Sequence, residues 1–161
     1  MTDASRSIEN LQKALAMEMT AIHQYLLHAH VLEDWGLDVL ADRMRDEMTE
    51  ELGHAKRFID RILYLGGDPE VKAGKSTRAA KALKDLFAAD LEEETGAIAF
   101  YTDAAVAAQE DRDIGTRMLF EQIVLDEEGH QEWLTRQLDL LKRMGEAAFM
   151  AQNMSDIAEG A

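Results

Sequence analysis

Six ionisable residues of the chain follow one spacing rule, and this rule restricts the fold more than any other feature of the sequence. A lone Glu is followed after 33 residues by a Glu-x-x-His pair, and the same set returns 76 residues later. Glu18, Glu51 and His54 thus recur as Glu94, Glu127 and His130. This repetition indicates a duplicated pair of helices in which each half supplies the same three side chains.

The six residues lie on apolar stripes of four long helical segments. Apolar residues recur at steps of three and four over ranges 5–34, 38–65, 77–108 and 113–144, which is the period of a helix. Gly36, Gly66 and Gly145 suit the helix ends, and Thr77 suits the start of the third helix. A short fifth helix is predicted over residues 146–156. With no alternating strand pattern, we expect an all-α four-helix bundle.

The connection between the second and third helices is the longest loop expected. Residues 66–76 number 11 and could span about 36 Å when extended. The second helix, at about 28 residues, would be about 42 Å long. The linker could therefore cross over along the bundle and make the two helices parallel. It could also fold back into a simple up-down order, or remain mobile.

The stripes bring the six ionisable groups to one place in the core. Residues three apart on a helix lie on adjacent turns of the same face, so each Glu and His pair can reach one point. Unpaired buried charges are costly, and divalent cations would neutralise four carboxylates. One Glu from each of two helices and Glu-x-x-His from the other two form the known ligand pattern of di-iron and di-manganese bundles.

The types of ligand atom narrow the choice of metal, and the symmetry of the pattern assigns a role to each ligand. The chain has no cysteine, which excludes thiolate sites, and mixed carboxylate and imidazole ligands suit iron or manganese. Zinc remains a substitute metal. From the symmetry, two glutamates bridge both metals and each remaining Glu and His pair caps one metal: the bridges are Glu51 and Glu127, and the caps are Glu18 with His54 and Glu94 with His130.

Three further residues fall near this predicted centre. Asp90 and Asp126 could hold the N–H groups of the metal-binding histidines, or they could simply be solvated. Tyr25 lies seven residues after Glu18 and therefore on the same helix face. It is a hydrogen-bond donor or redox-active residue beside the site, or a simple core tyrosine.

Composition sets the class of protein. The 161 residues fit one domain, 1–161, and the net charge of −15 argues against nucleic-acid binding and favours attraction of cations. No apolar run reaches the roughly 20 residues of a membrane span. The N-terminus lacks the basic and apolar regions of a signal peptide. We expect a cytoplasmic protein that does not bind membranes.

The pattern Glu18, Glu51-x-x-His54, Glu94, Glu127-x-x-His130 resembles the ferroxidase centre of bacterioferritins. The similarity extends along nearly the whole chain, including QYLLHA, DWGL, RILYLGG and LDLLKRMG. It implies a ferritin-like bundle with a long crossover between the second and third helices. It also implies two iron ions per subunit, oxidation of Fe(II) by O₂ or H₂O₂, and storage in a homo-oligomeric shell of about 24 subunits.

One position departs from the family pattern. Bacterioferritins bind haem between two subunits through a methionine directly after the first bridging Glu, and here that residue is Leu52. The family's haem is therefore not expected in this chain, unless it co-assembles with a haem-binding subunit. Electron delivery for iron release is left open, with a ferredoxin-type protein as one candidate. The resemblance also places Asp46 and Glu50 at the shell interior, where they could bind iron.

Two other functions compete with iron storage. One is a di-iron or di-manganese redox enzyme that acts on peroxide or another small substrate. It would need inserted segments to form a substrate pocket, and 161 residues leave little room for them. The other is a helical interaction module, which would not explain six ionisable groups under one spacing rule.

Overall fold

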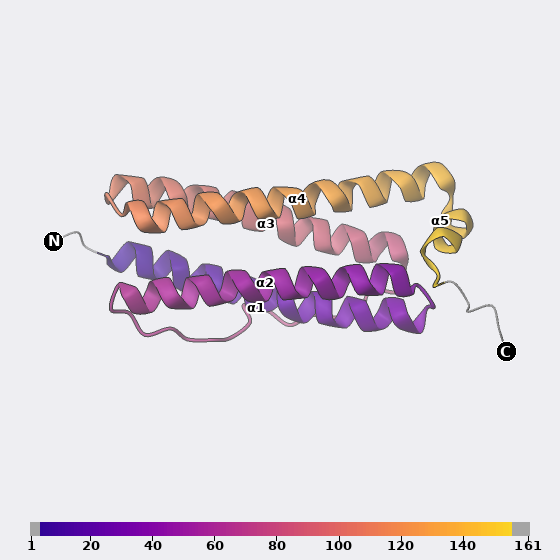
Figure 1. Ribbon diagram of the computed structural model, residues 1–161, viewed down its shortest axis with the longest axis horizontal. Helices are drawn as coiled ribbons and strands as arrows, with labels where there is room; N and C mark the ends of the chain where they lie inside the picture. The colour runs from indigo at the N-terminus through magenta and orange to yellow at the C-terminus, as the bar shows by residue number, and fades with distance from the viewer. Residues whose placement is uncertain (1–3, 156–161) are drawn as a thin grey trace.

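Four long helices run side by side in the computed structural model, which describes residues 4–155, and a short fifth helix covers one end (Figure 1). The helices are α1 Ser5–Asp34, α2 Asp38–Tyr64, α3 Leu83–Glu110, α4 Ile114–Met144 and α5 Glu146–Asn153. Residues 4–155 contain no strand. The predicted all-α bundle is confirmed, including the short fifth helix; the expected end of that helix, residue 156, lies outside the described residues.

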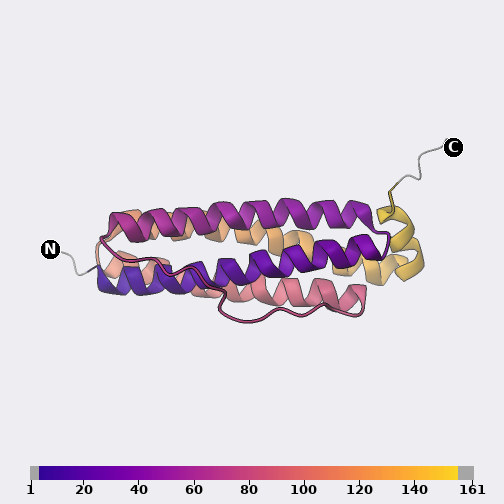
Figure 2. The same ribbon diagram turned by 90° about the horizontal axis from the view of Figure 1, so that it is seen from below.

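The connection from α2 to α3 travels the length of the bundle, so these two helices are parallel (Figure 2). Gly74 fixes the connection to α1, because its backbone N–H lies 3.1 Å from the carbonyl oxygen of Ala16 and 2.9 Å from Oγ1 of Thr20. The crossover expected from the family resemblance is confirmed, and the simple up-down alternative is wrong.

The third helix begins later than the sequence predicted. We expected Thr77 as its N-cap, but α3 starts at Leu83 after Ala82, and no side chain caps it. The crossover consequently occupies residues 65–82 rather than 66–76. The physical reason is the distance that the linker must span. Helix α2 has 27 residues and is about 40 Å long. A linker that runs along this length and also contacts α1 is not fully extended, so it needs more residues than the minimum.

Glycines end the first two helices as predicted. Gly36 has φ +78° and Gly66 has φ +80°, a left-handed conformation that glycine adopts without steric cost. In each case the next residue closes the helix: the N–H of Leu37 lies 2.9 Å from the carbonyl of Leu32, and that of Gly67 lies 2.9 Å from the carbonyl of Ile62.

A band of ionisable side chains divides the apolar core into two clusters. One cluster lies toward the start of α1 and includes Leu11, Leu15, Phe58, Tyr101 and Phe120. The other lies toward α5 and includes Tyr25, Leu32, Met44, Phe87 and Leu134. The six predicted ligands lie between them along all four long helices. Apolar packing on both sides therefore fixes the helices that carry the polar band.

We expect Gly36→Ala to lower the thermal unfolding midpoint, because a Cβ in the left-handed region costs about 1–2 kcal/mol. Gly96→Ala is the matched control: Gly96 lies within α3, and an added Cβ there meets open space. Circular dichroism melting of both variants is the measurement. Gly96→Ala should melt no lower than the wild type, because Ala is favoured over Gly in a helix interior. If Gly36→Ala also melts no lower than the wild type, the role given to the left-handed glycine is wrong.

Candidate metal centre

All six predicted ligands meet in the middle of the bundle. Their residues are only 1–3% exposed, and they form two groups whose candidate ligand atoms lie within 4.8 Å of one another. One group is Glu18, Glu51, His54 and Glu127, and the other is Glu51, Glu94, Glu127 and His130. Glu51 and Glu127 belong to both groups. The structure thus brings together every side chain of the spacing rule.

Local helix geometry explains why these side chains point inward. On α2, Met44 and Phe58 are fully buried one to two turns from Glu51 and His54, so the same stripe carries the polar pair into the core. On α4, Phe120 and Leu134 flank the second pair in the same way. The ligands are held inside by the apolar residues before and after them.

The two histidines face the bridging carboxylates in matching ways. Nδ1 of His54 lies 2.9 Å from Oε1 of Glu127 and 3.4 Å from Oε2 of Glu51. Nδ1 of His130 lies 2.9 Å from Oε1 of Glu51 and 3.3 Å from Oε2 of Glu127. Each of these two glutamates therefore turns one oxygen toward each histidine, as a carboxylate that bridges two cations must do.

Glu18 and Glu94, the two glutamates predicted to cap one metal each, each approach one histidine. Oε1 of Glu18 lies 3.7 Å from Nδ1 of His54, and Oε1 of Glu94 lies 3.6 Å from Nδ1 of His130. The two imidazole rings are stacked 6.4 Å apart at an angle of 23°. The arrangement has an approximate twofold symmetry that relates α1 and α2 to α3 and α4.

Several atoms of this cluster that could bind a metal are buried without a hydrogen-bond partner. They are Oε1 of Glu51, both carboxylate oxygens of Glu127, and Nδ1 of His54 and of His130. Buried polar atoms are nearly always hydrogen-bonded, and these five all belong to residues of the two candidate ligand groups. Their chemistry fits two cations, because carboxylate oxygen and imidazole nitrogen are ligands of iron and manganese.

Protons and cations compete for this cluster. Burial raises the pKa of Glu18 and Glu94 well above the usual range, and neighbouring glutamates add to the shift. Burial alone would lower the pKa of His54 and His130, but the carboxylates around each ring outweigh it and raise both pKa values. The cluster therefore retains protons that divalent cations would have to displace.

The outer ring nitrogen of His54, which is Nε2, has the partner that the sequence predicted. Nε2 of His54 lies 3.0 Å from Oδ2 of Asp126 on the opposite helix. The matching prediction for Asp90 is wrong, because that carboxylate contacts other residues. Its Oδ1 lies 2.8 Å from Nδ1 of His28 and accepts a hydrogen bond from Gln24 at 2.8 Å. His28, to which the sequence gave no role, is a buried partner in the core.

The outer nitrogen of His130 has partners that sequence reasoning missed. Nε2 of His130 lies 2.9 Å from Oε2 of Glu50 and 2.7 Å from Oε2 of Glu47. The 76-residue offset relates Glu50 to Asp126, so applying the rule to Asp126 would have found it. Glu47 has no such counterpart. It lies one turn before Glu51 and pairs with Arg43.

Two tyrosines donate to the capping glutamates. The hydroxyl of Tyr25 donates to Oε1 of Glu94, so the hydrogen-bond role predicted for this residue is confirmed. The hydroxyl of Tyr101 donates to Oε1 of Glu18 at 2.6 Å, a contact that the sequence did not suggest. Burial raises the pKa of both phenols well above the usual range, and nearby glutamates add to it, so both remain protonated donors.

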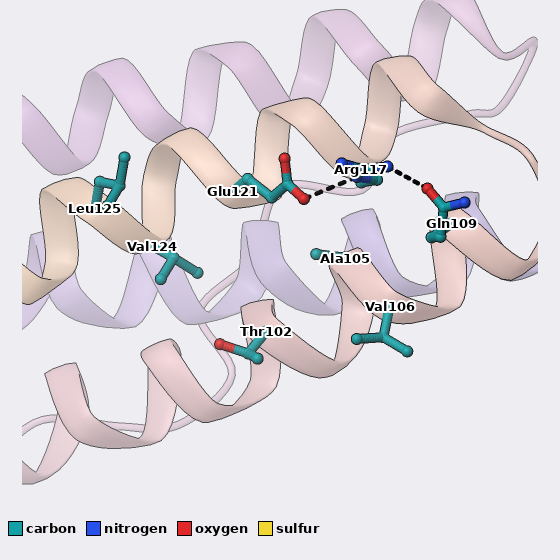
Figure 3. A pocket seen from close by; sticks show the side chains of 8 residues that line it. All are labelled: Thr102, Ala105, Val106, Gln109, Arg117, Glu121, Val124 and Leu125. Atoms are coloured by element: carbon teal, nitrogen blue, oxygen red, sulfur yellow. Dashed lines mark hydrogen bonds and ion pairs between the residues drawn. The ribbon is translucent and has the colours of Figure 1, made fainter.

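The space beside the cluster is small. A cavity of about 10 Å³ touches Glu18, Glu94 and Tyr101, which is room for about one water molecule. A pocket of about 500 Å³ lies elsewhere, between α3 and α4, and Figure 3 shows the residues that line it, among them Val106, Val124 and Leu125. Arg117 bonds Glu121 and Gln109 at its edge. None of the six ligands lines that pocket.

The sequence is similar to known proteins over nearly its whole length. A ferritin-like domain model matches residues 8–144. The bacterioferritin of Rhodobacter capsulatus is 37% identical over 161 residues, covering 99% of this chain and 100% of that protein. The bacterioferritin of Mycolicibacterium paratuberculosis is 39% identical over 145 residues, covering 90% of this chain and 91% of that protein.

Solved structures give the same result. The structure of Rhodobacter capsulatus bacterioferritin superposes with a TM-score of 0.94 at 36% identity and covers 99% of this chain and 100% of that one. It is described as having a metal-free dinuclear site and a haem iron in a crystallographic special position. Mycobacterium tuberculosis bacterioferritin BfrA superposes with a TM-score of 0.92 at 35% identity, covering 96% of this chain and 98% of that one.

We expect divalent metal to raise the unfolding temperature of metal-free protein, because cations that bind only the folded cluster stabilise it by about 2.7 kcal/mol at 100 times Kd. Melting with and without Mn(II) or Zn(II) measures the shift. The double variant Glu51→Gln, Glu127→Gln is the control and should respond little. An equal shift in the variant would show that the stabilising metal binds elsewhere.

Proposed function

The chain belongs to the bacterioferritin family of ferritin-like proteins, and from this premise we propose that its six buried residues hold two iron ions as a ferroxidase centre. Iron storage with such a centre is the function that the relatives support. The observation that carries the proposal is the pair of overlapping ligand groups, which share Glu51 and Glu127. In these groups Oε1 of Glu51, both oxygens of Glu127 and Nδ1 of each histidine are buried without a hydrogen bond.

Each ligand has one role in this proposal. Glu51 and Glu127 bridge the two ions, which agrees with the way each carboxylate divides its oxygens between the histidines. Glu18 and Glu94 each cap one ion beside a histidine. The four carboxylates then balance the charge of two divalent ions within the core.

The acidic residues that contact Nε2 of each histidine determine the tautomer of the ring. When Oδ2 of Asp126 accepts a hydrogen bond from Nε2–H of His54, the lone pair of Nδ1 would be free for a metal. Oε2 of Glu50 would do the same for His130, and the charge of Glu47 lies 2.7 Å from the same ring nitrogen. These contacts fix each ring in the tautomer that can bind a cation.

The reaction removes two electrons from the iron pair. When bound, each Fe(II) supplies one electron, and O₂ or H₂O₂ accepts both together with two protons. The chain supplies the anionic ligands that favour the ferric product, because added positive charge is stabilised by the surrounding carboxylates.

The competing function, a di-iron or di-manganese enzyme acting on peroxide or another small substrate, has less support. The relatives named above are bacterioferritins, so this alternative is not favoured. A substrate much larger than water would also need a pocket at the metals, and the cavity of about 10 Å³ does not provide one. The relatives support a homo-oligomer, and we propose a shell of about 24 subunits.

Several expectations from the sequence stay predictions. They are iron rather than manganese or zinc as native metal, a ferredoxin-type reductant, iron binding by Asp46 and Glu50 inside the shell, and a cytoplasmic location. Within residues 4–155, no helix combines the length and apolar character needed to cross a membrane.

The residues do not fit a haem bound through paired methionines. Leu52 is 58% exposed on α2, so it is available at the surface but has no lone pair to offer iron. Met48 lies one turn earlier, about 6 Å along the helix axis. We propose that shells made only of this chain lack this haem, unlike the Rhodobacter capsulatus structure described with haem iron.

Replacing Glu51 and Glu127 together with Gln is expected to abolish rapid Fe(II) oxidation, because both metal positions lose their bridging charges. The helical fold should remain. Stopped-flow absorbance after Fe(II) is mixed with aerated protein measures the rate, and the double variant Glu92→Gln, Glu128→Gln at two exposed positions is the control for lost charge. Wild-type kinetics in the double variant would refute the ligand assignment.

Haem content gives a separate prediction. Haem-supplemented homomer should contain no stoichiometric haem, whereas Leu52→Met should gain it, because the substitution supplies a thioether donor at the surface of α2. A pyridine haemochrome assay measures the content. About one haem per two subunits in the unmutated homomer would contradict the inference from Leu52.

A further inference from the structure

The two tyrosines at the metal centre obey the same offset as the ligands. Tyr25 lies seven residues after Glu18, Tyr101 lies seven residues after Glu94, and 76 residues separate the tyrosines. Each hydroxyl crosses to the other half of the bundle: Tyr101 on α3 donates to Glu18 on α1, and Tyr25 on α1 donates to Glu94 on α3. The capping glutamates are therefore held reciprocally.

The ring of Tyr101 is fixed by its surroundings. Its centroid lies 5.6 Å from that of Phe58, 5.7 Å from that of Phe120 and 6.1 Å from that of Phe100. Tyr101 belongs to the apolar cluster on one side of the metal centre, and Tyr25 belongs to the cluster on the other side. Each hydroxyl thus lies where an apolar cluster meets the polar band, with little freedom to move.

A hydrogen bond at this place orients a carboxylate. The terminal torsion of a glutamate is broad, so a buried carboxylate without a fixed partner can turn. Oε1 of Glu18 accepts from Tyr101 at 2.6 Å and lies 3.7 Å from Nδ1 of His54. The hydroxyl therefore holds the carboxylate in the orientation that faces this histidine.

We propose that Tyr101 is the positioning residue for the metal position capped by Glu18 and His54, and that Tyr25 serves the position capped by Glu94 and His130. This rests on the proposed function, since it assumes that the six residues bind two cations. Each tyrosine acts through one glutamate, so each affects one metal position. A simple core tyrosine would affect folding stability without this selectivity.

The test uses Co(II) as a spectroscopic probe on the metal-free assembled protein. The wild type should bind two Co(II) ions per subunit, followed by visible absorption. Tyr101→Phe keeps the packed ring and removes only the hydroxyl. We expect it to weaken one of the two binding steps about 10–100-fold, the usual effect of losing a partner that orients a ligand. Tyr64→Phe is the matched control, because Tyr64 is 76% exposed on α2.

Histidine variants identify the affected position. In His130→Ala, the remaining strong position is that of Glu18 and His54, and adding Tyr101→Phe should weaken it about 10–100-fold. In His54→Ala, the other position remains, and adding Tyr101→Phe should leave Co(II) binding unchanged. Tyr25→Phe should give the opposite pattern in the two backgrounds.

The outcomes separate this proposal from the proposed function. If Tyr101→Phe lowers the melting temperature but leaves both Co(II) steps unchanged, the positioning role is overturned and the metal centre stands. Equal weakening of both steps would also overturn it, because the effect would not act through Glu18. If the wild type does not bind two Co(II) ions per subunit, the proposed centre fails and the role of Tyr101 fails with it.

Discussion

Four carboxylates buried in one helical core are the constraint on which this structure depends. Glu18, Glu51, Glu94 and Glu127 are 1–3% exposed, and mutual repulsion at such depth is very costly unless protons or cations balance it. Without metal, retained protons reduce the charge, as the raised pKa values of Glu18 and Glu94 indicate. When two divalent ions bind, their positive charge balances the negative charge of the four carboxylates. Folding and metal binding are therefore linked in this chain.

The rest of the bundle provides what this cluster needs. Two apolar clusters on either side hold four helices in register, and the long crossover makes α2 and α3 parallel, so the halves are related by an approximate twofold axis. That symmetry extends beyond the ligands: Asp126 and Glu50 contact the outer nitrogens of His54 and His130 from the opposite half. The cluster is thus supported from both sides by the same kinds of contact.

Sequence reasoning predicted that the six residues cluster, because their spacing follows helix geometry, which acts over a few turns. It placed Glu51 beside His54 and identified the stripe that carries them, and both are properties of one helix. It missed what depends on how helices face one another, such as the contact of Asp90 with His28 and that of Glu47 with His130. It also began the third helix at Thr77, since local preference cannot show how far the crossover must travel. Tyr101 could have been found by applying the offset to Tyr25.

The most direct test of the central claim is anomalous diffraction at the iron edge from crystals loaded anaerobically with Fe(II). The account predicts two peaks per subunit inside the bundle. One should lie beside Nδ1 of His54 and Glu18, the other beside Nδ1 of His130 and Glu94, with Glu51 and Glu127 contacting both. A single peak, or peaks only on the outer side at Glu50 and Asp126, would contradict it.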